Sequence, residues 1–178
     1  MLAFSAYGPL EGCTPHVGYV KLNGTTVWEG SWCGNTDNNR GVNTILIDPF
    51  ICSTQETRHF DTHYSLLGST QLINYLQQVD NGSIIVVVSA DEPTRHLSSD
   101  AKSTLRLLGA DVSDVQFRGS FGFIAQKNFP AKTALRKAVT EADSNSNPAQ
   151  VIATITGIHN DVTTHWLFVI QHTHLSKH

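Results

Sequence analysis

The sequence lacks the features that mark membrane-spanning, nucleic-acid-binding and zinc-binding proteins. No apolar run approaches the roughly 20 residues that a membrane-spanning helix needs. There are 12 Lys and Arg against 15 Asp and Glu, so the net charge of −3 provides no basic field for a nucleic acid. No Cys-x-x-Cys pair occurs, which argues against a structural zinc site. The first residues show no charged region followed by a long apolar core, so no signal peptide is visible, although a processed secretory protein stays open.

The motifs of nucleotide-binding and hydrolytic enzymes are also missing. Alternating strand and helix patterns between 42 and 142 would allow a doubly wound fold, but neither Gly-x-Gly-x-x-Gly nor a P-loop occurs. The stretch 118–122 has Arg where a nucleophile elbow needs Gly. His59 and His63 are four residues apart near a strand end, where the two rings need not share a face, and chance pairs are expected among nine His. We therefore expect no metal or other cofactor and no enzymatic activity.

Cysteines and glycosylation sequons favour an extracellular protein. Cys13, Cys33 and Cys52 all fall in the first third of the chain, where a local disulfide would leave one thiol over. Asn23 and Asn81 each begin an Asn-Gly-Thr/Ser sequon, which permits glycosylation in a secreted chain. Asn-Gly is also a favoured hairpin turn, so turn chemistry alone can explain both matches.

At 178 residues the chain is expected to form one domain with a sizeable core. Hydrophobic periodicity and turn residues predict a hairpin over 17–22 and 25–28, strands over 42–47, 56–60, 84–88, 121–125, 151–158 and 166–170, and helices over 69–79, 98–108 and 131–142. The strand over 84–88 holds five β-branched residues in succession and is expected to be central. Trp28 is interpreted as half-buried core rather than as a sugar-stacking residue.

Three charged residues, Arg40, Asp91 and Arg118, each lie beside a predicted core strand. Two guanidinium groups and one carboxylate would make a clamp for the hydroxyl and amide groups of a sugar. Gly41 follows Arg40 and allows a backbone conformation that other residues avoid. The alternative is that these residues make ordinary surface salt bridges, each worth about 0–1 kcal/mol.

Four stretches, in this order along the chain, resemble the GG domain, also called the interleukin-like EMT-inducer (ILEI) domain. They are Arg40-Gly41-Val42-Asn43, Arg58-His59-Phe60-Asp61-Thr62, Leu105-Arg106-Leu107-Leu108-Gly109 and Phe117-Arg118-Gly119-Ser120-Phe121-Gly122-Phe123. The resemblance covers about residues 15–158 and leaves 159–178 as a C-terminal extension of a single domain. It implies an α+β fold, with two packed β-sheets in a sandwich and flanking helices, rather than a doubly wound sheet.

The resemblance also implies a function. The family includes secreted cytokine-like proteins, modules of cell-surface hyaluronan-binding proteins and the lectin-like stem domain of the protein O-mannose N-acetylglucosaminyltransferase. The sugar contacts of that stem domain match Arg40, Asp91 and Arg118. We therefore expect an extracellular carbohydrate-binding protein whose partner is a glycan, such as one on a cell-surface glycoprotein. The alternative is a secreted cytokine-like signalling protein that acts through a receptor surface.

The chain departs from the family pattern at several positions. Phe117 stands where a Trp is expected before the second Arg, and Gly119 stands where an Asp is expected after it, so the identity of the sugar is open. The usual cysteine pattern of the secreted members is not reproduced. Cys13–Cys33 is the first candidate for a disulfide, and the third Cys leaves open whether two chains join in a homo-oligomer.

Overall fold

The computed structural model of the chain describes residues 3–5, 16–32, 39–90, 92–117, 119–128, 138–140, 149–151, 153–159 and 162–169. Its elements are β1 (Ala3–Ser5), β2 (His16–Leu22), β3 (Thr25–Trp32), β4 (Gly41–Ile47), β5 (Thr54–Phe60), α1 (Leu66–Gln78), β6 (Ile84–Ala90), α2 (Ser99–Leu107), β7 (Ser120–Gln126), β8 (Ala138–Thr140), β9 (Ala149–Val151), β10 (Ala153–His159) and β11 (Val162–Val169).

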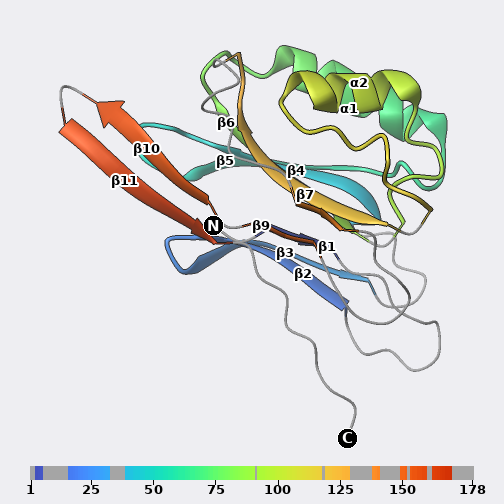
Figure 1. Cartoon of the computed structure of the whole chain (residues 1–178), viewed down its shortest axis with the longest axis horizontal. Coiled ribbons are helices and arrows are strands. Elements are labelled where there is room, and N and C mark those ends of the chain that lie inside the picture. Colours follow the sequence, from blue (N-terminus) through green and yellow to red (C-terminus); the bar gives the residue numbers. More distant parts are fainter. Residues whose placement is uncertain are drawn as a thin grey trace, which may run out of the picture.

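The described strands form antiparallel sheets. A five-stranded sheet has the order β5-β4-β6-β7-β8, a four-stranded sheet has the order β10-β11-β2-β3, and β1 pairs with β9. Figure 1 shows α1 and α2 side by side over one face of the five-stranded sheet, with β2 and β3 on the other side. This arrangement confirms the predicted α+β sandwich with flanking helices.

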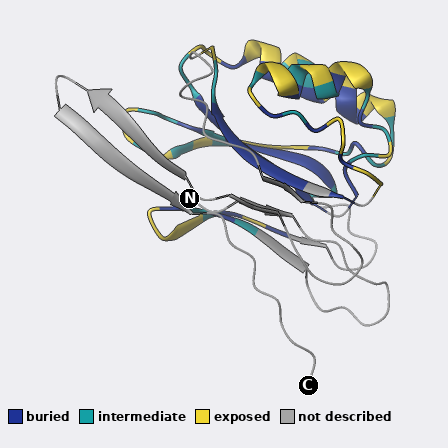
Figure 2. Ribbon diagram, viewed as in Figure 1, coloured by how far each residue is buried: buried dark blue, intermediate teal, exposed yellow. Residues whose placement is uncertain are grey.

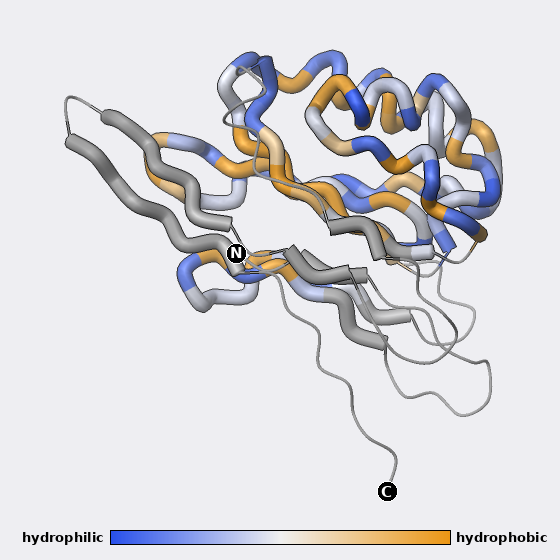
Figure 3. Tube along the Cα trace, in the orientation of Figure 1, coloured by the Kyte–Doolittle hydropathy of each residue, from blue (hydrophilic) through white to orange (hydrophobic). Residues whose placement is uncertain are grey.

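Strand β6 explains why the sheet supports a core on each face. All of its residues are buried, and successive side chains on a strand point to opposite faces. Ile84, Val86 and Val88 pack in a cluster with residues of β2 and β3, whereas Ile85 and Val87 pack in a second cluster with residues of α1 and α2. The buried and apolar colouring of this strand in Figures 2 and 3 marks it as the centre of the fold, as its five β-branched residues predict.

Local turn chemistry predicts the first hairpin correctly. Asn23 and Gly24 have φ values of 50° and 83°, the positive values that a type I′ turn requires at both central positions. Trp28, on β3, is only 9% exposed and packs in the core between the sheets. The interpretation of Trp28 as a core residue is therefore confirmed.

The two described helices fall close to their predicted positions. Helix α1 begins at Leu66, three residues before the predicted start, and ends at Gln78. Helix α2 begins after Ser98, whose side chain accepts a hydrogen bond of 3.1 Å from the amide of Ala101. Gly109, with φ of 100°, ends this segment as predicted.

One prediction in the last third of the chain is wrong. The predicted helix over 131–142 does not form at Ala138–Thr140, which is strand β8 paired with β7; the rest of that range lies outside the described residues. The strand predicted over 151–158 is confirmed by β10, which begins two residues later and pairs with β11, whereas Val151 is the last residue of β9, which pairs with β1. A short apolar run fits the periodicity of a helix and of a strand equally well. Residues 138–140 form a strand because they pair with the edge of β7.

Candidate functional site

The loops at one end of the five-stranded sheet form the most densely hydrogen-bonded polar region that the structure describes. Gly41 at the start of β4 lies opposite Ala90 at the end of β6, and Val42 lies opposite Phe60 at the end of β5. The segments that precede β4 and follow β5 and β6 therefore leave the sheet at the same end. We call this region, made of Arg40, residues 61–65 and residues 92–98, the Arg40 end.

Arg40 is held by a two-point ion pair with Asp61. Its Nη2 donates to Asp61 Oδ2 over 2.8 Å and its Nε donates to Asp61 Oδ1 over 3.3 Å. The two side chains are 15% and 25% exposed, so the pair lies at the surface rather than in the core. A planar guanidinium that meets a carboxylate in this way is fixed in orientation.

Asp61 also organises the turn that follows β5. Its Oδ1 accepts hydrogen bonds from the amides of His63, over 3.2 Å, and Tyr64, over 2.9 Å. Burial on its own would raise the pKa of Asp61. The hydrogen bonds from Arg40 and the Tyr64 amide, with the positive charge of Arg40, outweigh burial and lower the pKa of this carboxyl below its usual value.

Gly41 is required where β4 meets the end of β5. It has φ of 103°, and a Cβ at this position would lie 2.4 Å from the carbonyl oxygen of Phe60 and 2.7 Å from the amide nitrogen of Thr62. The predicted need for glycine after Arg40 is thus met by both backbone conformation and space. The backbone of Arg40 itself is fixed by His59, whose Nε2 lies 2.5 Å from the Arg40 carbonyl oxygen.

Glu92 plays a comparable role in the loop after β6. The residue is 2% exposed, and its Oε1 accepts hydrogen bonds from the amide of Thr94, over 2.8 Å, and from the Thr94 hydroxyl. Its Oε2 accepts from the Arg95 amide over 2.9 Å and lies 3.1 Å from His63 Nδ1. Burial on its own would raise the pKa of Glu92. These hydrogen bonds outweigh burial and lower the pKa.

Hydrogen bonds between the two loops make them one unit. The buried hydroxyl of Thr62 donates to the Pro93 carbonyl over 2.7 Å, and the His96 amide donates to the Thr62 carbonyl over 2.8 Å. His96 Nδ1 lies 2.6 Å from the His63 carbonyl, and the Ser69 hydroxyl of α1 donates to the His96 carbonyl over 2.6 Å. The Arg40 end is therefore a rigid platform rather than a set of independent loops.

Two exposed aromatic side chains border the platform. Tyr64 is 77% exposed and Phe117 is 61% exposed. Tyr64 belongs to the turn that Asp61 caps, and the residue before Phe117, Gln116, has a carbonyl 3.4 Å from the Thr94 hydroxyl. The hydrogen-bonded polar groups of the Arg40 end and the exposed rings of Tyr64 and Phe117 therefore lie on segments that contact each other.

Of the predicted clamp residues, the structure places Arg40 alone; Asp91 and Arg118 lie outside the described residues. Their described chain neighbours do come together, because Glu92 contacts His63 and Gln116 contacts Thr94. The convergence of the three clamp side chains stays a prediction. Cys13 and Cys33 also lie outside the described residues, and Cys52 is a free thiol.

Sequence reasoning missed the residues that build the platform. Asp61 and Thr62 lie in a stretch that carries the family resemblance, which gives them no role, and the partners of Glu92 at His63, Thr94 and Arg95 become visible only in the fold. Within the described ranges, no group of three or more His, Cys, Asp or Glu residues could hold a metal ion. Over the same ranges, no helix has the length and apolar character needed to cross a membrane.

Comparison with known proteins gives the family. The family model described as "Interleukin-like EMT inducer" matches residues 40–129, which is half of the chain and includes the whole Arg40 end. Protein FAM3B from Homo sapiens is 26% identical over 110 residues, covering 61% of this chain and 46% of the relative. Protein FAM3C from Xenopus tropicalis is 25% identical over 101 residues, covering 56% of this chain and 43% of the relative.

A much larger relative also matches this chain. The cell migration-inducing and hyaluronan-binding protein of Mus musculus is 31% identical over 121 residues, covering 67% of this chain and 8% of the relative. The chain thus spans less than half of the FAM3 relatives and a small part of the hyaluronan-binding protein. The family model matches half of this chain, and the chain belongs to the interleukin-like EMT inducer (ILEI) family.

Proposed function

We propose that the protein binds a carbohydrate at the Arg40 end. Arg40 and Arg118 donate hydrogen bonds to ring hydroxyl or N-acetyl oxygens, and Asp91 accepts hydrogen bonds from hydroxyls. The observation that carries the proposal is the partly exposed, two-point pair of Arg40 with Asp61 on a rigid platform.

Rigidity favours sugar binding because a sugar offers many weak polar contacts and little apolar area. The guanidinium of Arg40 is already oriented by Asp61, so little side-chain entropy is lost when a ligand binds. The pairing also changes the role first expected of Arg40. It acts as part of an Arg–Asp unit that can donate and accept, rather than as an isolated donor.

The surroundings of the platform support the same class of ligand. Tyr64 and Phe117 present flat apolar surface, onto which the C–H face of a sugar ring can pack. One relative is named a hyaluronan-binding protein, and its match covers 67% of this chain. Hyaluronan is therefore the first polysaccharide to test, together with glycans that end in β-linked N-acetylglucosamine.

The proposal places the protein outside the cell and gives it a binding role rather than a catalytic one. The side chains of Asn23 and Asn81 are exposed, so both sequons are accessible for glycosylation in a secreted chain. Incubation with hyaluronan should leave the polymer length unchanged, as measured by gel filtration. Shortening of the polymer would refute the binding-only role.

A glycan array followed by calorimetry tests the proposal. Arg118→Ala should weaken binding about 10- to 100-fold, since a charge-assisted hydrogen bond is worth about 1.5–3 kcal/mol. Arg58→Ala is the matched control, because Arg58 is an exposed arginine paired with Glu56 along β5. It should bind like the unchanged protein, and circular dichroism should show both variants folded. Absence of binding to every glycan would refute the proposal.

A cytokine-like signalling role is the second candidate, and one observation favours it. Tyr64, Leu66 and Leu67, at the start of α1, are 77%, 59% and 62% exposed, and contiguous apolar surface is typical of protein-binding sites. Leu66→Ser with Leu67→Ser should then abolish binding to responsive cells and leave glycan binding unchanged. Equal cell binding by this variant and the unchanged protein would exclude this surface as the receptor contact.

A further inference from the structure

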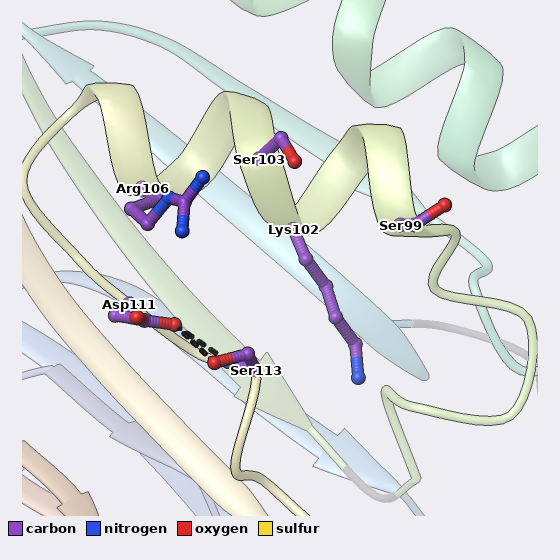
Figure 4. A pocket seen from close by; sticks show the side chains of 6 residues that line it. All are labelled: Ser99, Lys102, Ser103, Arg106, Asp111 and Ser113. Carbon is purple, nitrogen blue, oxygen red and sulfur yellow. Dashed lines mark hydrogen bonds between the residues drawn. The ribbon is translucent and has the colours of Figure 1, made fainter.

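A depression beside α2 has the composition of an anion site. It has a volume of about 190 Å³ and is lined by Ser99, Lys102, Ser103 and Arg106 of the helix and by Asp111 and Ser113 of the segment that follows it. Figure 4 shows Lys102 extending from α2 toward the side on which Asp111 and Ser113 lie. None of these residues belongs to the Arg40 end.

The helical lining residues form one stripe. Positions 99, 102, 103 and 106 follow the spacing that brings side chains to the same face of a helix. Lys102 and Arg106 are one turn apart, and neither makes an ion pair with any residue in the part of the chain that the structure describes. Like charges at this spacing repel each other and destabilise a helix, so an anion between them would remove an unfavourable interaction.

The one carboxylate in the depression, that of Asp111, accepts two hydrogen bonds from Ser113. Oδ1 of Asp111 accepts hydrogen bonds from the amide of Ser113, over 2.9 Å, and from its hydroxyl, over 2.5 Å. Figure 4 shows the second of these bonds. The lining therefore has two cations and one carboxylate, with the hydroxyls of Ser99 and Ser103 as further donors on the same stripe.

We propose that this depression binds a tetrahedral oxyanion carried as a monoester, that is, a sulfate or phosphate group attached to a larger molecule. The planar guanidinium of Arg106 can contact two of its oxygens, while Lys102 acts as a point charge on the third. The three terminal oxygens of a tetrahedral group point in different directions, so one group can accept hydrogen bonds from several donors of the lining at once. A carboxylate, with two oxygens in one plane, matches this lining less well. Ser103, Arg106 and Ser113 of the lining are exposed, so the rest of the ligand can extend into solvent.

A titration with three related sugars tests the proposal. Galactose 6-sulfate, galactose 6-phosphate and galactose are added to the isotope-labelled protein at 0.15 M salt, and amide shifts are followed by NMR. Both esters should shift the amides of residues 99–106 and 111–113, whereas galactose should leave them unchanged. Tighter binding of one ester identifies whether sulfated or phosphorylated molecules are the source. Shifts at Arg40 and residues 61–64 report on the Arg40 end separately, so either proposal can fail alone.

Charge variants give the decisive comparison. Arg106→Gln and Ser103→Asp should each weaken ester binding about tenfold or more, and Lys21→Gln, which removes a cation on β2, should not. Asp111→Asn should strengthen binding several-fold. Asp114→Asn makes the same change of net charge on a residue outside the depression and should have little effect. Equal effects of Asp111→Asn and Asp114→Asn, or unchanged binding in Arg106→Gln, would refute the site.

Discussion

Glu92→Gln should destabilise the protein strongly, although the substitution barely changes the volume of the side chain. Both oxygens of this carboxylate, which is 2% exposed, accept hydrogen bonds: Oε1 from Thr94 and Oε2 from the Arg95 amide. A glutamine amide has one oxygen and one NH₂ group, and the NH₂ group cannot accept. In either orientation of the amide, donors of the loop face another donor.

The magnitude follows from the number of donors left without an acceptor. If the NH₂ group replaces Oε2, the Arg95 amide loses its acceptor; if it replaces Oε1, the amide and hydroxyl of Thr94 lose theirs. The first orientation leaves one donor unsatisfied and each such donor costs about 1–3 kcal/mol, so the free energy of unfolding should fall by about 1–3 kcal/mol. Urea denaturation measures this change, and hydrogen exchange should quicken at the amides of Thr94 and Arg95.

The control for this prediction is Glu29→Gln. Glu29 is exposed on β3, so the same chemical change there should alter the free energy of unfolding by no more than about 0.5 kcal/mol. A loss in Glu92→Gln that does not exceed the loss in Glu29→Gln would show that the Glu92 hydrogen bonds do not hold the loop. The rigid platform would then lose its main support.

Two further predictions concern the same end of the sheet. Gly41→Ala should lower the free energy of unfolding by about 1–3 kcal/mol through backbone strain, and further because its Cβ would lie 2.4 Å from the Phe60 oxygen. Gly24→Ala is the control, since this position has a similar positive φ but open space around it. An equal loss of melting temperature in both variants would exclude a contribution from the clash. The pKa values of Asp61 and Glu92 lie below their unfolded values, so the stability that these groups add is complete above about pH 4.3 and is lost as the pH falls through their folded pKa values. The urea midpoint should therefore fall as the pH is lowered below about 4.3, and should fall less in Glu92→Gln.

The parts of the fold that the sequence predicted are those that depend on local signals. The Asn23-Gly24 turn follows from the backbone preferences of two adjacent residues, and the central position of β6 follows from five successive β-branched residues. The failures lie where local signals are ambiguous. The pattern in Ala138–Thr140 fits a helix as well as a strand, and pairing with β7 makes it a strand.

The candidate site was harder to predict because its contacts join distant parts of the chain. Arg40 and Asp61 are 21 residues apart, and Thr62 and Pro93 are 31 residues apart. A charged residue beside a predicted strand can be recognised in a sequence, but its partner cannot. For this reason Arg40 can be predicted from the sequence only as an isolated donor, whereas in the structure it has a fixed carboxylate partner, Asp61.

This distinction limits what family membership can say about the ligand. The residues that carry the resemblance, such as Arg40, Gly41, Asp61 and Thr62, are engaged in an ion pair, a close backbone contact and a bond between loops. A sequence that retains them retains the platform, whatever it binds. The ligand depends instead on the side chains that surround the platform, and Phe117 lies among these at a position where the family pattern has Trp. Members of one family can therefore share this fold and bind different molecules. Arg118→Ala, together with a change at Phe117, is a sharper test of function than a change at Arg40, because a change at Arg40 would also disturb the fold.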